Sequence, residues 1–530
     1  MIWHIVRKDL SLLWPVVLTV AAVHMLAALL GVYVGRFSEP QSLAKYIPML
    51  SLLSFLGVVV LTVVVFHQDP VPGDRQDWLA RPIRRRDLAC AKLLFVILFA
   101  AAPLLAADLL AAMLDGFPVA AALSSASWRS AAVLCLFGMP ALALGAVTRN
   151  VTEALMVGIA AAALCVGVAV VSDLLNARSS IGGSGLMWMI FAGWCLLPLL
   201  SAPILAWFQY TYRRTATARA VIAAGVVMAT AMLFLPWSTG FALQTTLSGE
   251  PQAGRNIILS FAPDYGRFHY DAGAAAETAE GVSAVGPVTL YLPLRAEAVP
   301  ADGLLIADAA VVSIDSLDGR PLYRGRSNIS IDGPGSFRDA QLEIEPPPSK
   351  QGASFVHQRL FLPRKVYASL ASMRVRLAVD YSLTLFRVFQ THHVTAVAGS
   401  ERSGDFGWCG TKVDRDGDGV VLACLNGGSL PTCFRAYLVL PDTPLKNPDL
   451  HSCAPDYGLT RVHLTSAVPT FDLEFPFLDP TGLAHFPIDG AHIKNAQVAF
   501  LNYTPRNHFV RRLVIPDFNV SEWVAASATN

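Results

Sequence analysis

Charged residues are scarce in this chain. Only 15% of its 530 residues are Asp, Glu, Lys or Arg, against about 25% in an average soluble protein. Hydrophobic residues make up 54%, and the mean hydropathy is +0.48. This composition excludes a disordered chain, a coiled coil and an ordinary cytosolic enzyme. It predicts a chain that spends part of its length in lipid.

The chain also lacks a strong excess of either charge. Its formal net charge is +1, which is too small to indicate a nucleic-acid partner. The small total conceals two different halves. Residues 1–240 hold 16 basic and 10 acidic side chains, whereas residues 241–530 hold 24 basic and 29 acidic ones.

Catalytic motifs are missing as well. None of the eight lysines follows a glycine, so the chain has no Walker A sequence, and ATP hydrolysis requires a partner subunit. Neither HExxH nor G-x-S-x-G is present. His392 and His393 lie in a strand-like run, where neighbouring side chains point to opposite faces. We therefore expect no enzyme activity and no cofactor in this chain.

Seven segments are apolar for about the 20 residues that a membrane helix needs. The fourth and fifth are short and are joined only by residues 148–150, so a hairpin of tilted arms is the alternative. The first is too long for a signal peptide and lacks a cleavage site. The predicted spans are Leu10–Val34, Ile47–Phe66, Leu93–Met113, Ser130–Val147, Ala154–Val171, Leu186–Phe208 and Ala220–Trp237.

Loop charge predicts the orientation of these spans. With the N-terminus inside the cell, the inner loops hold 12 Lys and Arg residues and the outer loops hold 4, which are Arg36, Lys45, Arg129 and Arg178. Basic residues favour the cytoplasmic side. We therefore expect a multi-pass protein of a bacterial inner membrane, with residues after Trp237 in the periplasm.

Three ionisable residues lie within or near the predicted spans, namely His24, Asp108 and Glu153. Charge inside a membrane is costly and indicates function by default. The alternative is structural: Asp108 and Glu153 reach the lipid headgroups, and His24 is a neutral side chain hydrogen-bonded between helices. Sequence does not separate these interpretations.

The longest inner loop is residues 67–92. Pro70 ends the second span, a short amphipathic helix carries Trp78, and Pro82 ends that helix before the arginines at 84–86. An aromatic side chain beside an arginine cluster is suited to docking a cytoplasmic partner. The alternative is that the arginines bind lipid phosphates and fix the topology.

This loop resembles the first cytoplasmic loop of ABC type-2 exporter permeases. The matching residues are Asp69-Pro70, Trp78, Arg81-Pro82-Ile83, Arg85 or Arg86, Leu88, Ala91 and Lys92. Met1–Leu10 is similar to the interfacial elbow helix of that family. The resemblance covers about residues 1–210.

The resemblance implies a permease subunit that binds a separate ABC ATPase and pairs with a second copy or a sister subunit. Trp78, Arg81, Pro82 and Arg85 would lie at the ATPase contact. A seventh span and a large exported region depart from the family. These two differences leave a second role open, in which the membrane helices transmit force or assemble a complex and do not transport a substrate.

From residue 241 onward, short runs alternate between apolar and polar residues, as in Val288–Leu292 and Phe471–Phe475. Alternation of this kind, broken by Gly, Pro, Asp and Asn, is typical of antiparallel β-sandwiches. We expect a transmembrane domain at 1–240, a β-sandwich domain at 241–395 and a second β-domain at 396–530. One elaborated β-domain is the alternative.

Asp414, Asp416, Asp418 and Gly419 match the start of a calcium loop, but position 12 is Leu425 instead of Glu. An acidic hairpin turn explains the same residues. Cys409 and Cys424 flank this turn, so we expect a disulfide across the base of the hairpin. With Cys433 and Cys453 they make a cluster of four cysteines, which predicts two disulfides. Three pairings of the four residues are possible.

The sequence therefore predicts an α-helical polytopic membrane domain followed by an all-β extracytoplasmic region. The first functional hypothesis is the membrane permease subunit of an ABC exporter. The second is a membrane anchor or sensor that presents a periplasmic β-domain to envelope proteins. A membrane-bound periplasmic enzyme is a third hypothesis, and it lacks a catalytic constellation.

Overall fold

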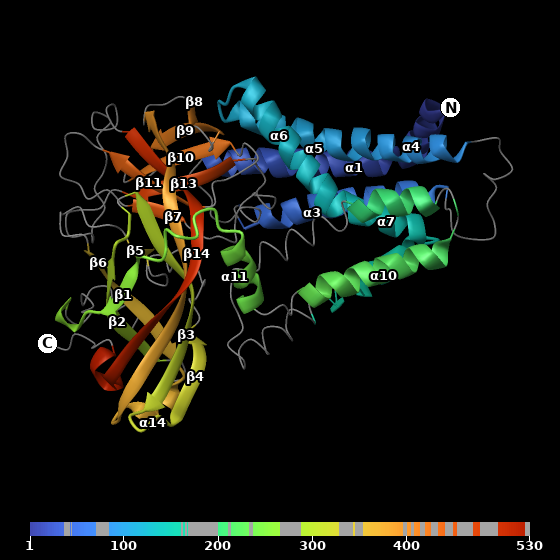
Figure 1. Cartoon of the computed structure of the whole chain (residues 1–530). Helices are drawn as coiled ribbons and strands as arrows, with labels where there is room; N and C mark the ends of the chain where they lie inside the picture. Colours follow the sequence, from blue (N-terminus) through green and yellow to red (C-terminus); the bar gives the residue numbers. More distant parts are fainter. Residues whose placement is uncertain are drawn as a thin grey trace.

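The computed structural model contains a helical region followed by a β-rich region, as Figure 1 shows. It describes residues 1–36, 43, 45–69, 84–160, 163–164, 167, 200–209, 212, 214–232, 237–265, 288–300, 302–327, 343–344, 353–395, 400–403, 407–413, 419–425, 433–439, 449–452, 470–476 and 497–524. The predicted order of a membrane domain and a β-region is thereby confirmed.

Within the described residues, four helical segments are long and apolar enough to cross a membrane: Ile2–Val34, Met49–His67, Arg86–Leu114 and Val119–Val147. These match the first four predicted spans. Shorter apolar helices cover Val151–Ala160 and Thr215–Met228, and they overlap the first halves of the predicted fifth and seventh spans. Most of the predicted sixth span, and the predicted fifth span after residue 167, lie outside the described residues. The helical region is thus that of a membrane protein.

The helical elements follow one another closely in the chain. They are α1 (Ile2–Arg36), α3 (Ile47–His67), α4 (Arg85–Val96), η2 (Ile97–Ala101), α5 (Ala102–Leu114), α6 (Val119–Val133), η3 (Leu134–Gly138), α7 (Met139–Val147), α10 (Thr215–Met232) and α11 (Trp237–Thr246). The predicted elbow is the first part of α1, which bends away from the rest of that helix in Figure 1.

The fourth span corrects the sequence prediction. It begins at Val119 instead of Ser130, so it is 29 residues long and is by itself long enough to cross a membrane. The sequence prediction places Arg129 in an outer loop. Arg129 is instead a buried helical residue, because Asp108 on α5 neutralises it. A paired charge does not end a membrane helix.

Two prolines explain two widened helical turns. Pro103 and Pro140 lack a backbone N–H, and the ring of each proline clashes with the preceding turn of an α-helix. Each follows a π-helical segment, η2 in the first case and η3 in the second. A π-turn absorbs this mismatch without ending the helix. The two spans therefore stay continuous through their prolines.

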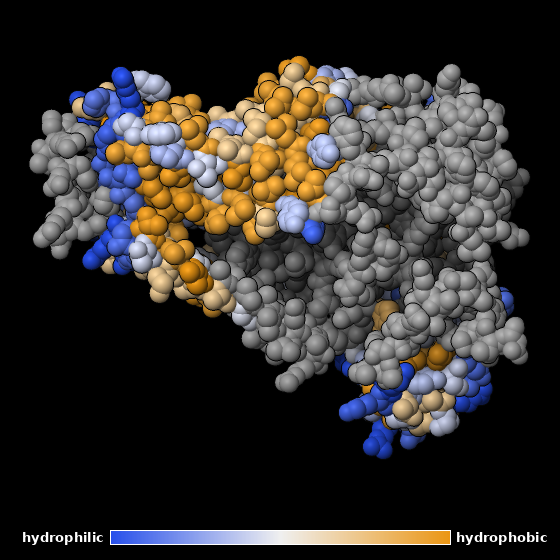
Figure 2. Space-filling view, turned by 180° about the vertical axis from the view of Figure 1, so that it is seen from behind, coloured by the Kyte–Doolittle hydropathy of each residue, from blue (hydrophilic) through white to orange (hydrophobic). Residues whose placement is uncertain are grey.

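The helices pack around an apolar core. Buried members of this core include Val58 and Leu61 of α3, Phe95 of α4 and Val133 of α6, all of which are fully buried. The outward side chains are also apolar, for example Leu18 and Leu52. Figure 2 shows this as a continuous hydrophobic surface over the helices, ended by a band of hydrophilic residues. Such a surface suits lipid.

The described strands of the β-region form three antiparallel sheets. Sheet orders are β1-β2-β6, then β13-β10-β9-β8, and finally β12-β11-β14-β7-β3-β4 with β5 on β3. The strands are β1 (Ile258–Phe261), β2 (Val288–Glu297), β3 (Gly303–Ser316), β4 (Pro321–Ser327), β5 (Glu343–Ile344), β6 (Ala353–Leu362), β7 (Arg374–Thr395), β8 (Ser400–Ser403), β9 (Gly407–Val413), β10 (Gly419–Leu425), β11 (Cys433–Val439), β12 (Asp449–Ser452), β13 (Thr470–Pro476) and β14 (Gln497–Asn519).

The core of the β-region lies between two of these sheets. Leu290 and Leu360 from the three-stranded sheet share one buried cluster with Leu377 and Leu383 of the largest sheet. Alternate residues along β7 supply this core, as the period-two pattern predicts. One short helix, α14 (Arg364–Leu370), follows Pro363 in the β-region.

The largest sheet takes strands from both sides of the predicted domain boundary. β7 pairs with β14 from Arg374 to Thr395, and β14 pairs in turn with β11. Strands from 241–395 and strands from 396–530 thus share the largest sheet. This pairing is the arrangement expected of the alternative with one elaborated β-domain.

The helical and β-regions meet at one end of the helices. Ala112, Phe117 and Ala122, around the turn between α5 and α6, pack with Trp408 and Leu425 of β9 and β10. In Figure 1 the N-terminus and the start of α4 lie at the opposite end. We call the end beside the β-region the β-proximal end and the other the β-distal end.

Candidate functional site: an ion network at the base of the 70–83 loop

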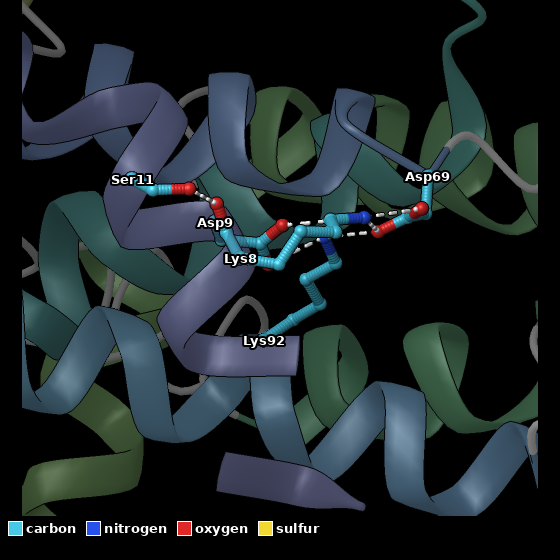
Figure 3. A network of polar contacts seen from close by, with 5 residues as sticks. All are labelled: Lys8, Asp9, Ser11, Asp69 and Lys92. Atoms are coloured by element: carbon cyan, nitrogen blue, oxygen red, sulfur yellow. Dashed lines mark hydrogen bonds and ion pairs between the residues drawn. The ribbon is translucent and has the colours of Figure 1, made fainter. Parts of the chain in front are cut away.

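Four charged side chains meet at the β-distal end of the helices, and Figure 3 shows their arrangement. The Lys92 Nζ atom donates to Asp9 Oδ2 at 2.8 Å and to Asp69 Oδ2 at 2.7 Å. Lys8 Nζ lies 2.9 Å from both carboxylate oxygens of Asp69. We call these four residues the basal ion network.

The network joins three parts of the chain. Lys8 and Asp9 belong to the first turns of α1, and Asp69 follows the end of α3 at His67. Lys92 is in α4, whose first residue is Arg85. The apolar packing of Ile5 and Val6 against Leu88 and Phe95 holds α1 beside α4. The ion network therefore rests on an apolar contact between the same helices.

Burial makes these ion pairs unusual. The side chains of Lys92 and Asp9 are fully buried, and that of Asp69 is 12% exposed. Two lysines and two aspartates give the network no net charge. Burial of one unpaired member would cost several kcal/mol, of the order of 3–5. Loss of Lys92, Asp9 or Asp69 alone would therefore leave a buried charge without its partner, whereas the Lys8 side chain is 36% exposed.

The pKa of Asp69 reflects the same balance. Burial of its carboxyl group alone raises the pKa, but the ammonium groups of Lys92 and Lys8 outweigh burial and lower it below its ordinary value. Asp69 is therefore ionised at neutral pH. The pairing with Lys92 and Lys8 is thus present under ordinary conditions.

The network lies at both ends of the loop that the sequence singles out. Asp69 is the last described residue before residues 70–83 of this loop, and Arg84 is the first described residue after them. Trp78, Arg81 and Pro82 lie outside the described residues. Arg85 begins α4, and its side chain is not described. The structure thus shows the base of the predicted docking loop.

Glu153 has local partners at the β-distal end. Its carboxylate accepts from Arg219 at 2.6 Å and from the Arg149 backbone N–H at 2.6 Å. Its own backbone N–H donates to Asn150 Oδ1. These contacts cap the helix that begins at Val151 and attach it to α10. These structural contacts account for the presence of Glu153 without a role in transport or binding.

A second polar cluster lies inside the helical region. Asp108 of α5 and Arg129 of α6 form a buried salt bridge, and His24 of α1 is hydrogen-bonded to Ser54 of α3. The charge of Arg129 also interacts electrostatically with the His24 side chain. The sequence hypothesis of a headgroup contact for Asp108 is wrong, because its side chain is 1% exposed and is paired within the bundle.

The disulfide between Cys409 and Cys424 is confirmed. The two residues face each other in the register of β9 and β10, with Cα atoms 4.0 Å apart. Cys433 begins β11, with its side chain not described, and Cys453 lies outside the described residues. The second predicted disulfide therefore stays a prediction.

The calcium hypothesis also stays a prediction, because Asp414, Asp416 and Asp418 lie outside the described residues. Elsewhere in the described part of the chain, no three His, Cys, Asp or Glu side chains gather as metal ligands would. His392 and His393 are adjacent in β7, the first partly buried and the second exposed. This fits the alternation expected of a strand.

Comparison with known proteins does not identify the chain: no family model matches it, and no curated protein matches it.

Proposed function

We propose that this chain is the membrane permease subunit of an ATP-driven export complex in a bacterial inner membrane. A separate ABC ATPase would bind the 67–92 loop, and a second copy or a sister permease would complete the transmembrane part. The observation that carries this proposal is the basal ion network. It fastens the predicted docking loop to the helices from which it emerges.

The network supports coupling because of where it acts. A loop held by backbone alone would absorb a push from a partner by flexing at its ends. Asp69 and Lys92 instead tie the two ends of this loop to each other, and both contact α1 residues. A force on the loop would then reach α1, α3 and α4 together.

The long helix beyond the network gives that force a path. α4, η2 and α5 run without interruption, and Arg86–Leu114 contains 29 residues. At a rise of 1.5 Å per residue this span is about 43 Å long. Ala112, in its last turn, packs against β9 and β10. One continuous helix therefore connects the loop to the β-region.

The disulfide supports the proposed orientation. Cys409 and Cys424 are bonded within the β-region, and disulfides persist in oxidising compartments such as the periplasm. The β-region lies at the end of the helices opposite the basal ion network. A periplasmic β-region therefore places the loop in the cytoplasm, where ATP is available.

Co-purification tests the proposal. Native membranes would be cross-linked, solubilised in detergent, and the tagged full chain captured and analysed by mass spectrometry. We expect a P-loop ATPase with the wild-type chain, and its loss from the Trp78→Ala and Arg81→Ala variants. Arg374→Gln is the matched control, because it removes an exposed ion pair of the β-region.

Two results would count against the proposal in different ways. Absence of any ATPase from the wild-type sample would reject the export complex. An ATPase that stays bound to both loop variants would reject only the assigned contact.

The second candidate is an anchor or sensor without transport, which presents the β-region to envelope proteins. The observation that favours it is the direct packing of β9 and β10 on the α5–α6 turn. Such packing holds an exported domain firmly at the membrane surface. In the capture experiment, this function predicts envelope proteins in place of an ATPase.

A further inference from the structure

Helix α11 (Trp237–Thr246) follows α10 in the chain but runs in a different direction. In Figure 1 its axis runs across the axes of α10 and of the other long helices, and it lies at their β-proximal end beside β14. Pro236 comes directly before it, and proline interrupts a preceding helix. Because the long helices cross the membrane, α11 has the direction of a helix that lies along the membrane surface.

One face of α11 is fixed to the largest sheet. Phe241 is 4% exposed and packs against Ala309 of β3. Its ring also meets the ring of His508 in β14 edge-on, with centroids 5.9 Å apart. Ser248, about two helical turns further along, accepts a hydrogen bond from the His508 backbone N–H at 3.0 Å. An apolar contact and a hydrogen bond therefore hold this face on the sheet.

The chain after α11 strengthens this attachment. The Glu250 backbone N–H donates to the Arg506 carbonyl at 3.0 Å, and the register of β14 with β7 shifts at this arginine. The Arg511 side chain of β14 donates to the Ile257 carbonyl at 2.9 Å. The end of α11 is thus fastened to β14 on both sides of residue 250.

The opposite face of α11 is apolar and exposed. Leu247 is 72% exposed and Leu243 is 41% exposed. The Leu247 N–H donates to the Leu243 carbonyl at 3.0 Å, so the two side chains lie one helical turn apart on the same face. At about 100° per residue, Leu243 lies about 200° and Leu247 about 240° round the helix from Phe241. The two leucines therefore point away from the sheet.

The surroundings of these leucines indicate lipid as their partner. No Asp, Glu, Lys or Arg occurs from residue 220 to residue 249, so α10 and α11 lie in one uncharged stretch of sequence. Leu52, near the β-proximal end of α3, is 66% exposed on the apolar outer surface of the helices. A surface helix at the ends of membrane spans places its apolar face at the boundary between headgroups and acyl chains.

We propose that α11 is an interfacial helix, with Leu243 and Leu247 inserted into the lipid leaflet on the β-proximal side and Phe241 holding the largest sheet on its other face. Lipid then supports the β-region through α11, in addition to the packing of β9 and β10 on the α5–α6 turn. Lipid contact by α11 does not depend on ATPase binding, so it holds or fails separately from the export function. The competing explanations are a helix in water and a helix covered by a second copy of the chain.

Spin labelling of the full chain in lipid nanodiscs tests the interfacial helix. The starting variant keeps the Cys409–Cys424 disulfide and replaces the remaining cysteines. Single nitroxide labels are then attached through Leu243→Cys and Leu247→Cys. Power-saturation EPR compares collisions of each label with oxygen, which concentrates in lipid, and with a neutral chelated nickel complex, which stays in water.

Two exposed apolar residues of the same chain supply matched controls. Ile258 of β1 is 58% exposed, and in Figure 1 β1 lies on the side of the β-region away from the helices. Ile258→Cys is therefore the reference for water. Leu52→Cys is the reference for lipid on the β-proximal side.

We expect the ratio of oxygen to nickel collisions at Leu243→Cys and Leu247→Cys to be roughly fivefold or more above that at Ile258→Cys, because apolar surroundings exclude a polar reagent. The ratio should approach that at Leu52→Cys. A ratio equal to that at Ile258→Cys would place α11 in water and overturn the proposal. Few collisions with either reagent would show that protein covers the leucines, which also overturns it.

A second measurement uses the wild-type chain and needs no cysteine substitution. Nanodiscs that contain a phosphatidylcholine with a diazirine in its acyl chain would be irradiated, and the cross-linked peptides identified by mass spectrometry. We expect cross-links in peptides that cover 241–248, as well as in α3, and none in peptides that cover 253–262. The double variant Leu243→Ser with Leu247→Ser should lose the cross-links at 241–248 and keep those in α3. Wild-type cross-links confined to the long helices, or cross-links at 241–248 that persist in the double variant, would overturn the proposal.

Discussion

Lys92 and Asp9 form a salt bridge of 2.8 Å with both side chains fully buried, although 83 residues separate them in the chain. Asp69 shares the same ammonium group, so Lys92 is bound to two carboxylates at once. Removing Lys92 would leave both carboxylates close together without their shared cation. This relationship makes Lys92 the most sensitive member of the basal ion network.

We expect Lys92→Met to destabilise the helical region by about 3–5 kcal/mol, the cost of a buried charge left without its partner. Thermal unfolding in detergent or nanodiscs measures the change. Combining Lys92→Met with Asp9→Leu and Asp69→Asn should recover much of the loss, since no buried charge then stays unpaired. A single variant as stable as the wild-type chain would contradict the buried network. Arg374→Gln, on an exposed pair, should change stability by about 0–1 kcal/mol.

The pair of Asp108 and Arg129 gives a second stability prediction. Arg129→Met alone leaves a carboxylate buried between helices, and we expect a loss of about 3–5 kcal/mol. The double variant Asp108→Leu with Arg129→Met should lie closer to the wild-type chain. A double-mutant cycle measured by thermal unfolding gives the interaction free energy between the Asp108 and Arg129 side chains. Additive effects of the two changes would mean that the side chains do not interact.

His508 predicts a pH dependence of the β-region. Its ring accepts or donates a hydrogen bond with Thr384 at 2.7 Å and meets Phe241 of α11 edge-on, and burial lowers its pKa from 6.5 to about 4. The unfolded chain therefore binds a proton between pH 6.5 and 4 that the folded chain does not. Stability should fall as pH is lowered through this range, by at most about 3 kcal/mol.

Denaturation of the full chain between pH 7.5 and 4 measures this loss, and His508→Gln is the matched variant. The glutamine amide can still hydrogen-bond Thr384 but does not titrate. The stability of the His508→Gln protein should therefore change less with pH than that of the wild-type chain. Identical pH profiles for the two proteins would rule out His508 as the group responsible.

The disulfide gives a local prediction. It closes a loop of 15 residues, for which chain entropy corresponds to about 3 kcal/mol. Replacing Cys409 and Cys424 by serine should loosen β9 and β10 and their contact with Phe117. Hydrogen exchange should rise in peptides from 407–425, while peptides from β3 and β7 stay protected. Equal changes throughout the β-region would show that the hairpin is not a separate unit.

The sequence predicts those features that depend on short stretches of chain. Long apolar runs identify the first four spans, alternation identifies the β-region, and two cysteines around an acidic turn identify the disulfide. Each of these signals extends over about 30 residues or fewer. Local composition decides them before any tertiary contact forms.

Arg129 shows what such signals miss. In isolation, an arginine within a serine-rich run resembles the end of a membrane helix. Only the antiparallel packing of α5 and α6, which turn at Gly116 with a φ of +90°, brings it to Asp108. The basal ion network is missed for the same reason, since Asp9, Asp69 and Lys92 are far apart in sequence.

The pairing of β7 with β14 determines when the β-region can form. Roughly a hundred residues separate the end of β7 at Thr395 from the start of β14 at Gln497. At synthesis rates of about 5–20 residues per second, β7 emerges some 5–20 seconds before its neighbour exists. During that interval one edge of a 22-residue strand is open to pairing with other chains. Nascent copies of this protein should therefore depend on a chaperone that covers this edge until synthesis reaches residue 519.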